Sequence, residues 1–236
     1  MSTARNGSGV SAVQWRSTMS RLVVTLVILA VLLFVPAGRI TWTRGWIFLL
    51  FFALLMAASI VYFMRSKPEM FAVRSRVHPD TKRWDKIVIC LLFVAILAIP
   101  LVAGLDDGRF HWSSMSCWVV ALGYFVQLAG WIGVAWAETV NRFFEPGVRI
   151  QTERGHHVID AGPYDLIRHP GYFAAVLLFV GIALSLGSWW ALIPAGFGSV
   201  LLVLRTVWED RTLHAELPGY AAYAQRVRFR LVPGVW

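Results

Sequence analysis

Charged residues are scarce in this chain, and their scarcity excludes an ordinary water-soluble domain. Only 15% of the 236 residues are charged and 58% are hydrophobic, whereas a soluble domain carries roughly 25% charged residues. The hydrophobic residues gather in long runs that contain no ionisable side chain. The length suits one domain. We therefore expect a single integral membrane domain over residues 1–236.

Cysteine is almost absent as well, since the chain has only Cys90 and Cys117. Two cysteines inside apolar runs build neither a disulfide framework nor a metal site, and we predict no metal. We expect both to be small buried hydrophobic residues. The net charge of +9 could indicate nucleic-acid binding, but the distribution of basic residues along a membrane chain explains it better. We predict no nucleic-acid partner.

Five apolar segments predict the architecture. The first four are each long enough for one crossing, which takes about 17–25 residues. The fifth would reach about 50 Å as one helix, so it must reverse, and Leu186-Gly187-Ser188-Trp189-Trp190 permits this. We predict an all-α polytopic transmembrane helix bundle of about six membrane segments, the last two forming a tight hairpin. The apolar segments are 22–38, 45–64, 87–104, 116–136 and 172–204.

The basic residues predict the orientation of the bundle. With the N-terminus inside, 19 of the 22 lysines and arginines fall on the cytoplasmic side, as expected of a membrane protein. We expect both termini to be cytoplasmic, and the excess of arginine over lysine suggests a bacterial cytoplasmic membrane. A cleaved signal peptide ending near Val35-Pro36-Ala37 is the alternative for the first segment. The lack of intramembrane charge disfavours a transporter.

Smaller features of the fourth apolar segment predict helix packing. Gln127 is expected to form a hydrogen bond between helices, and Gly123, Gly130 and Gly133 are expected to permit close approach of a neighbouring helix. These residues therefore point to structure rather than to a site.

The cytoplasmic stretch 138–172 is dense in polar groups and long enough to indicate a functional loop. Pro170 sets the first turn of the next helix, so Arg168 and His169 stand at its mouth, where free backbone N–H groups favour anions. Tyr164 and Tyr172 accompany them. We interpret this cluster as a site rather than as an ordinary membrane-edge histidine.

The C-terminal stretch offers the complementary charge. Residues 205–211 continue the last membrane helix, and Pro218-Gly219 breaks it before a helix that lies in the membrane interface. Glu209 and Asp210 form either a salt-bridged helix face or the carboxylates that hold a ligand's ammonium group. Because the hairpin brings 162–172 beside 205–214, a zwitterionic amino acid moiety fits between them.

Several motifs resemble one superfamily. GPYDLIRHPGYFA (162–174), WED (208–210) and PGYAAYAQRVRFRLVPGVW (218–236), arranged around an apolar hairpin, resemble the isoprenylcysteine carboxyl methyltransferase and phospholipid methyltransferase superfamily. NRFFEPGVRIQTERGHHVIDAGPY (141–164) resembles its bacterial isoprenylcysteine methyltransferase-like branch.

The resemblance implies that the C-terminal half, 137–236, binds S-adenosyl-L-methionine without a soluble Rossmann domain, while 22–136 supplies N-terminal transmembrane helices. Consistent with this, the chain has no strand followed by a glycine-rich phosphate loop. Asp210 departs from the glutamate that is commoner in the family. The candidate cofactor-binding residues are His157, Gly162, Tyr164, Arg168, His169, Pro170, Tyr172, Glu209, Asp210 and Tyr220; Tyr223 also matches the tail motif.

The implied reaction is methyl transfer at the cytoplasmic face to a carboxylate or thiol of a lipophilic small molecule or isoprenylcysteine-like acceptor that enters from the bilayer. Arg142 and Arg149 are candidate clamps for a carboxylate, and Glu138, Glu145 and His157 are candidate bases. The catalytic candidates are thus Arg142, Arg149 and Glu138. The alternatives are a phospholipid or lipid-amine N-methyltransferase and a non-enzymatic membrane scaffold. Membrane lipids are the other expected partners.

Overall fold

The computed structural model describes residues 12–66 and 78–236, and every regular element in these ranges is helical. Five of the described helices are long and apolar enough to cross a membrane, and a shorter helix is also apolar. The predicted all-α bundle with about six membrane segments is confirmed, and the chain is a multi-pass integral membrane protein. Residues 67–77 of the basic connection 65–86 lie outside the described part.

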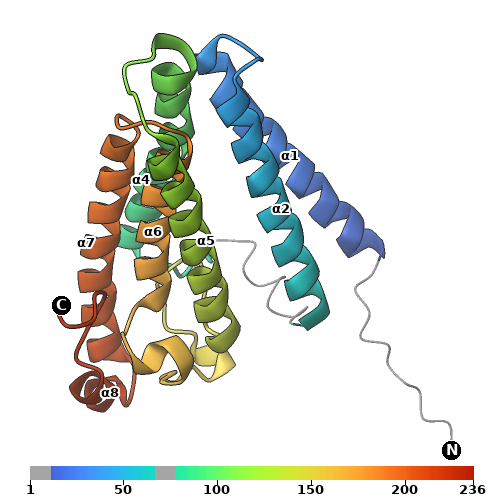
Figure 1. The fold of residues 1–236 in the computed structure, drawn as a ribbon. Coiled ribbons are helices and arrows are strands. Elements are labelled where there is room, and N and C mark those ends of the chain that lie inside the picture. Colours follow the sequence, from blue (N-terminus) through green and yellow to red (C-terminus); the bar gives the residue numbers. More distant parts are fainter. Residues whose placement is uncertain (1–11, 67–77) are drawn as a thin grey trace, which may run out of the picture.

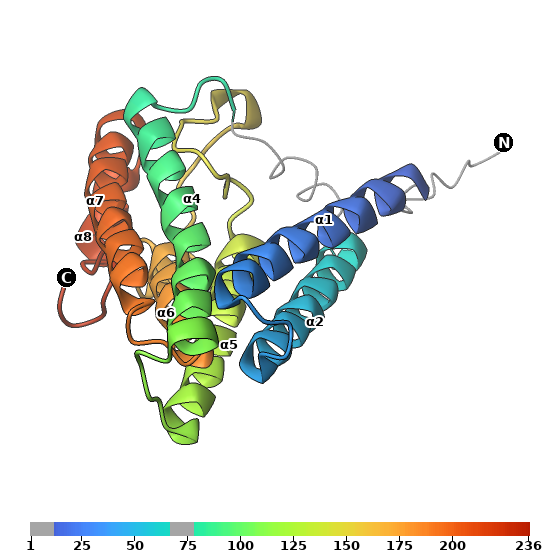
Figure 2. The same ribbon diagram turned by 90° about the horizontal axis from the view of Figure 1, so that it is seen from above.

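The first two helices, α1 (Ala12–Ala37) and α2 (Thr43–Ser66), form a pair that leans away from the rest of the bundle at one end (Figures 1 and 2). Gly38, in the turn between them, has a φ of 64°, a conformation that glycine adopts at little cost. Many of their valine, leucine and isoleucine side chains are exposed, as expected where lipid surrounds a helix. α1 begins well before residue 22. It includes Arg16 and Arg21, whose side chains are exposed and do not interrupt the helix.

The third membrane segment ends in buried polar residues that the sequence did not reveal. α4 (Arg83–Ala103) continues into a π-helical turn, η1 (Gly104–Phe110). Asp106 accepts hydrogen bonds from the hydroxyls of Ser113 and Ser188, each at 2.5 Å, and Asp107 accepts one from Trp42 Nε1 at 2.7 Å. These bonds fasten η1 to the α1–α2 turn and to the tip of the last hairpin.

The predicted hairpin is formed by α6 (Pro170–Ser185) and α7 (Leu192–Glu216). Gly187, between them, has a φ of 78°, so the reversal lies where the sequence placed it. α6 has 16 residues and is about 24 Å long, somewhat shorter than the hydrocarbon core of a bilayer. Since α7 is longer, its C-terminal turns reach past the start of α6.

Among the described helices, α5 (Cys117–Val140) and α6 form the most extensively packed pair. A Cβ atom added at Gly123 would lie 2.3 Å from the backbone nitrogen of Ser185, and one at Gly181 would lie 2.5 Å from that of Gln127. Ser185 also donates a hydrogen bond of 3.1 Å from its hydroxyl to Gln127 Oε1. The close packing through glycine and the interhelical bond of Gln127 are confirmed.

The two cysteines correct one expectation. Cys90 on α4 and Cys117 on α5 are both exposed, so the prediction that they are buried was wrong. Lipid tails are as apolar as the side chains of a neighbouring helix, so an apolar sequence context does not predict burial in a membrane bundle.

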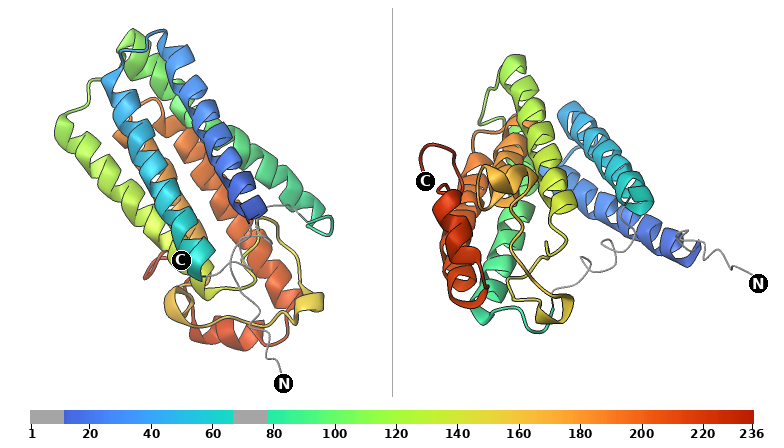
Figure 3. Two further views of the ribbon diagram at one scale, coloured as in Figure 1. Left: turned by 90° about the vertical axis from the view of Figure 1, so that its right-hand side faces the viewer. Right: turned by 90° about the horizontal axis from the view of Figure 1, so that it is seen from below.

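One end of the bundle is covered by connection 141–169 and by the short helix α8 (Tyr220–Arg226), as the right-hand view of Figure 3 shows. The connection contains two 3₁₀ turns, η2 (Thr152–Arg154) and η3 (Gly162–Asp165). The predicted break before α8 is present, with Gly219 at a φ of 83°. Tyr220 and Tyr223 of α8 are buried against Leu217, so α8 closes this end of the molecule.

Candidate active site

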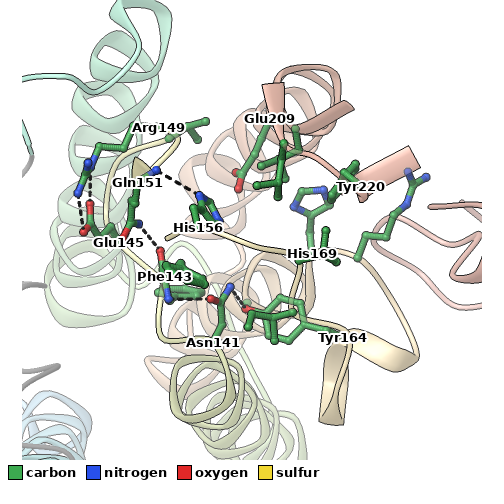
Figure 4. Close-up of a pocket in the computed structure, with 18 of the residues that line it drawn as sticks. Asn141, Phe143, Glu145, Arg149, Gln151, His156, Tyr164, His169, Glu209 and Tyr220 are labelled. Atoms are coloured by element: carbon green, nitrogen blue, oxygen red, sulfur yellow. Dashed lines mark hydrogen bonds and ion pairs between the residues drawn. The ribbon is translucent and has the colours of Figure 1, made fainter. Parts of the chain in front are cut away.

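A pocket opens between connection 141–169, the start of α6, the end of α7 and α8 (Figure 4). It holds about 980 Å³ of empty space, a volume that includes open solvent. Its walls combine polar groups with several aromatic rings. The aromatic side chains that line it are Phe143, Phe144, Tyr164, Tyr172, Tyr220 and Tyr223.

Connection 141–169 is held in shape by its own side chains. Gln151 donates from Nε2 to the carbonyl of Phe143 at 2.7 Å. The guanidinium of Arg149 pairs with Glu145 at 2.9 Å and with Glu153 at 2.7 Å. The hydrogen bond with Glu145 is the main cause that raises the pKa of Arg149, and the bond with Arg149 lowers the pKa of Glu153. The loop therefore presents a fixed wall to the pocket.

Two histidines of this wall make different contacts with the backbone. Burial lowers the pKa of His156 from 6.5 to about 4, helped by the charges of His157 and Arg149, so His156 is neutral at pH 7. Its Nδ1 accepts a hydrogen bond from the backbone of Gln151 at 3.3 Å, which leaves the proton on Nε2. In His157, Nδ1 lies 3.0 Å from the carbonyl of Gly155 and 3.5 Å from Nη2 of Arg142, so which of the two contacts is a hydrogen bond depends on the tautomer of the ring.

The opposite wall comes from the hairpin. Tyr172 on α6 donates a hydrogen bond to Glu209 on α7, and the ring of His169 stacks on that of Tyr172 with centroids 5.6 Å apart. His169 Nε2 is buried, has no hydrogen-bond partner and lies 3.5 Å from the carboxylate of Asp210. Figure 4 shows Glu209 and His169 on the same side of the pocket, facing His156.

Asp210 has a different position from its neighbour Glu209. It is 1% exposed and accepts hydrogen bonds from Arg168 at 3.0 Å, Tyr220 at 2.8 Å and Arg230 at 3.0 Å. Burial and this carboxylate raise the pKa of Tyr220. Asp210 thus ties together the start of α6, the start of α8 and the segment after it, behind the pocket wall.

The same segment occupies two backbone N–H groups at the start of α6. The backbone N–H of Arg168 donates to the carbonyl of Phe229 at 3.0 Å, and that of His169 donates to the carbonyl of Arg230 at 2.9 Å. Pro170 has no N–H. The N–H groups of Arg168 and His169 are therefore occupied, and the expected anion site at the N-terminus of α6 stays a prediction.

The structure gathers most of the sequence-predicted site residues around one pocket. Arg149, His157, Tyr164, Arg168, His169, Tyr172, Glu209 and Tyr220 line it. Glu138, Arg142, Gly162, Pro170 and Asp210 are not among the lining residues.

The residues outside the lining have definite positions nearby. Arg142 stacks on Phe143, with its guanidinium carbon 4.7 Å from the ring centroid. Gly162 begins η3 with a φ of 60°, and Pro170 begins α6. Glu138 is half-buried on the last turn of α5. The functional roles of all these residues stay predictions.

Sequence reasoning missed an ion pair in the pocket wall. Arg205 lines the pocket and donates to Asp85 from Nε at 2.8 Å and from Nη2 at 2.9 Å. Asp85 is completely buried and also accepts from the backbone N–H of Val148 at 2.6 Å. The two residues are 120 positions apart, so no local motif could reveal the pair.

A comparison with protein families identifies this arrangement. Residues 114–216 match the model of the phospholipid methyltransferase family. This part of the chain is similar to phospholipid methyltransferases. The match runs from just before α5 to the end of α7, so it contains α5, the loop and the hairpin. None of the proteins with curated descriptions matches this chain.

The chain is therefore a membrane methyltransferase that uses S-adenosylmethionine, and the pocket fits this donor. The carboxylate of Glu209 suits an ammonium group, and the aromatic walls suit a nucleobase. Of the pocket residues within the matched range, Glu145, Arg149, Arg168 and Arg205 are already ion-paired.

Proposed function

We propose that this methyltransferase transfers a methyl group from S-adenosylmethionine to a carboxylate or thiol of a lipophilic acceptor, such as an isoprenylcysteine-like compound. The observation that carries the proposal is the contact of Tyr172 with Glu209 beside the ring of His169. This contact places polar groups at the end of the apolar α6–α7 hairpin that lies opposite the turn at Gly187. An acceptor with a polar head and an apolar tail suits such a boundary.

The donor would be held by the pocket-facing groups of the hairpin and α8. Glu209 would bind the ammonium group, while Tyr164, Tyr172 and Tyr220 would pack against the rest of the molecule with His157 at the rim. Arg168, Asp210, Gly162 and Pro170 would fix the backbone and side chains that do so. When bound, S-adenosylmethionine supplies a methyl group on a positively charged sulfur, so the protein's task is mainly to position and desolvate the reactants.

Arg142 supports an anionic acceptor. Its guanidinium lies over Phe143, a residue of the pocket wall, and no ion pair links it to a carboxylate of the described residues. An exposed guanidinium in this position can bind a carboxylate through two hydrogen bonds. Arg149 could take this role only by leaving Glu145 and Glu153, and Glu138 would orient the end of α5.

A lipid amine is the second candidate acceptor, and His157 favours it. An ammonium group must lose a proton before it can accept a methyl group. With the proton on Nδ1, which lies 3.0 Å from the carbonyl of Gly155, the exposed imidazole of His157 would present Nε2 as the acceptor nitrogen. The description of the matching family, phospholipid methyltransferase, agrees with such an acceptor.

The proposal also includes the branch of the superfamily to which the chain belongs and the orientation of the chain in the membrane. The motifs at 141–164 support the isoprenylcysteine methyltransferase-like branch of the superfamily. The excess of basic residues at the pocket end supports a cytoplasmic pocket and cytoplasmic termini. An arginine-rich composition supports a bacterial cytoplasmic membrane.

Methyl transfer from isotope-labelled S-adenosylmethionine tests the proposal. The purified protein would be mixed with N-acetyl-S-farnesylcysteine and, separately, with a total membrane lipid extract. Alkali releases methanol from a methyl ester but not from a methylated thiol or amine. Label that alkali makes volatile supports the carboxylate, whereas stable label in a lipid amine supports the second candidate. Absence of transfer together with absence of S-adenosylhomocysteine binding by calorimetry would overturn the proposal.

A further inference from the structure

The guanidinium of Arg205 is only partly used by the protein. Arg205 is 7% exposed. Its Nε and Nη2 donate to Asp85, and Nη2 also donates to the carbonyl of Pro146 at 2.5 Å. Nη1 makes no hydrogen bond or ion pair with any residue that the structure describes. The pair with Asp85 balances the charge but leaves the two N–H groups of Nη1 without acceptors.

The geometry of the ion pair between Arg205 and Asp85 determines the direction in which the N–H groups of Nη1 point. A guanidinium that grips a carboxylate through Nε and Nη2 has Nη1 on its opposite side. The guanidinium of Arg205 also lies over the ring of Tyr172, 5.1 Å from the centroid, which fixes its plane. Because Arg205 and Tyr172 both line the pocket, Nη1 is presented to the pocket.

Other cations in the pocket wall are less suited to a second anion. Arg149 uses all three of its guanidinium nitrogens on Glu145 and Glu153. Arg168 uses both terminal nitrogens, one on Asp210 and one on the carbonyl of Arg228. Among the described arginines that line the pocket, Arg205 is thus the one with an unused terminal nitrogen.

We propose that Nη1 of Arg205 binds the α-carboxylate of S-adenosylmethionine, while Glu209 binds the α-ammonium group. Arg205 and Glu209 lie four residues apart on α7, where side chains of one helix face are neighbours with Cβ atoms about 5–6 Å apart. An α-amino acid carries its two charges on adjacent groups, so one helical turn offers a matching pair. This inference rests on the proposed donor site at Glu209.

Asp85 then acts as a positioning residue. It lies on α4, outside the matched range 114–216, and holds the guanidinium edge-on so that Nη1 faces the ligand. Because it also accepts from Val148 in the pocket loop, it fixes the loop and the arginine together.

Calorimetry with two ligands tests the role of Arg205. The ligands are S-adenosylhomocysteine and its decarboxylated analogue, which keeps the amine. We expect wild-type protein to bind the first at least about tenfold more tightly, and Arg205→Gln to abolish this preference by weakening S-adenosylhomocysteine alone. Equal losses for both ligands, or no loss, would overturn the inference. If wild-type protein binds neither ligand, the proposed function itself fails.

A second variant guards against misfolding. Arg205→Gln leaves the buried Asp85 without a counter-ion, which is destabilising. The double variant Asp85→Asn/Arg205→Gln removes both charges while keeping groups that can form hydrogen bonds. It should lose the preference in the same way and melt closer to the wild type. Arg211→Gln, at an exposed position of α7, is the matched control and should keep the preference; its loss would count against a specific role for Arg205.

Discussion

The phenol of Tyr172 donates a hydrogen bond to the carboxylate of Glu209, a residue 37 positions later in the chain. The bond joins the first turn of α6 to the end of α7 and exists because the hairpin folds back at Gly187. It holds one carboxylate of the adjacent acidic pair at the pocket surface. The other, Asp210, is buried behind the wall.

Glu209→Gln should reduce the affinity for S-adenosylhomocysteine at least about tenfold, because the hydrogen bond to a charged group is worth roughly 1.5–3 kcal/mol. The glutamine carbonyl can still accept the hydrogen bond of Tyr172, so the melting temperature should change little. Titration calorimetry measures the affinity. Glu216→Gln, an exposed glutamate on the same helix that pairs with Lys82, is the control. An unchanged affinity in Glu209→Gln would remove this residue from the donor site.

Asp210→Ala should destabilise the fold rather than only weaken binding. It deprives Arg168, Tyr220 and Arg230 of a shared buried acceptor, and breaking a buried ion pair costs about 3–5 kcal/mol. Denaturant unfolding in detergent, followed by circular dichroism, measures this change. A free energy of unfolding equal to that of the wild type would show that the carboxylate does not hold these elements together.

Acid should weaken the fold through His156. Its pKa is about 4 in the folded protein against an ordinary value of 6.5, so between these values only the unfolded chain takes up the proton. The contribution to the free energy of unfolding is complete above pH 6.5 and is lost as the pH falls towards 4. His156→Gln should flatten this part of the stability profile. A variant with the same pH dependence as the wild type would contradict the assignment.

Gly181→Ala should separate α5 from α6, because the added Cβ would lie 2.5 Å from the backbone nitrogen of Gln127. Overpacking of this kind costs typically 1–3 kcal/mol, and the melting temperature in detergent should fall. Gly196→Ala on α7 is the matched control, since nothing lies within 4 Å of its added Cβ. Similar melting temperatures for both variants would argue against tight packing at Gly181.

Much of the fold follows from the sequence because the bilayer sets the length of each helix. The run 172–204 is too long for one crossing, which was enough to place the turn near Gly187 and to bring His169 close to Glu209. The same reasoning could not find the burial of Asp106, because a short polar connection gives no sign of which side chains turn inward.

The sequence also could not predict which of Glu209 and Asp210 lines the pocket and which is buried behind its wall. Neighbouring residues on a helix point about 100° apart, so one of them must turn away from any given wall, and only packing decides which. The motif placed both acids near His169, as found. The burial of Asp210 depends on Arg230 and Tyr220, which follow α7 after a break in the helix.

The pair of Asp85 with Arg205 has a consequence for anyone who isolates the domain. A fragment of residues 114–216 would contain Arg205 but lack its counter-ion Asp85. It would also expose the apolar side chains that pack against α4 in the full chain. A fragment intended to keep the pocket intact should therefore include α4. In homologous chains, replacement at one of these two positions should be accompanied by replacement at the other.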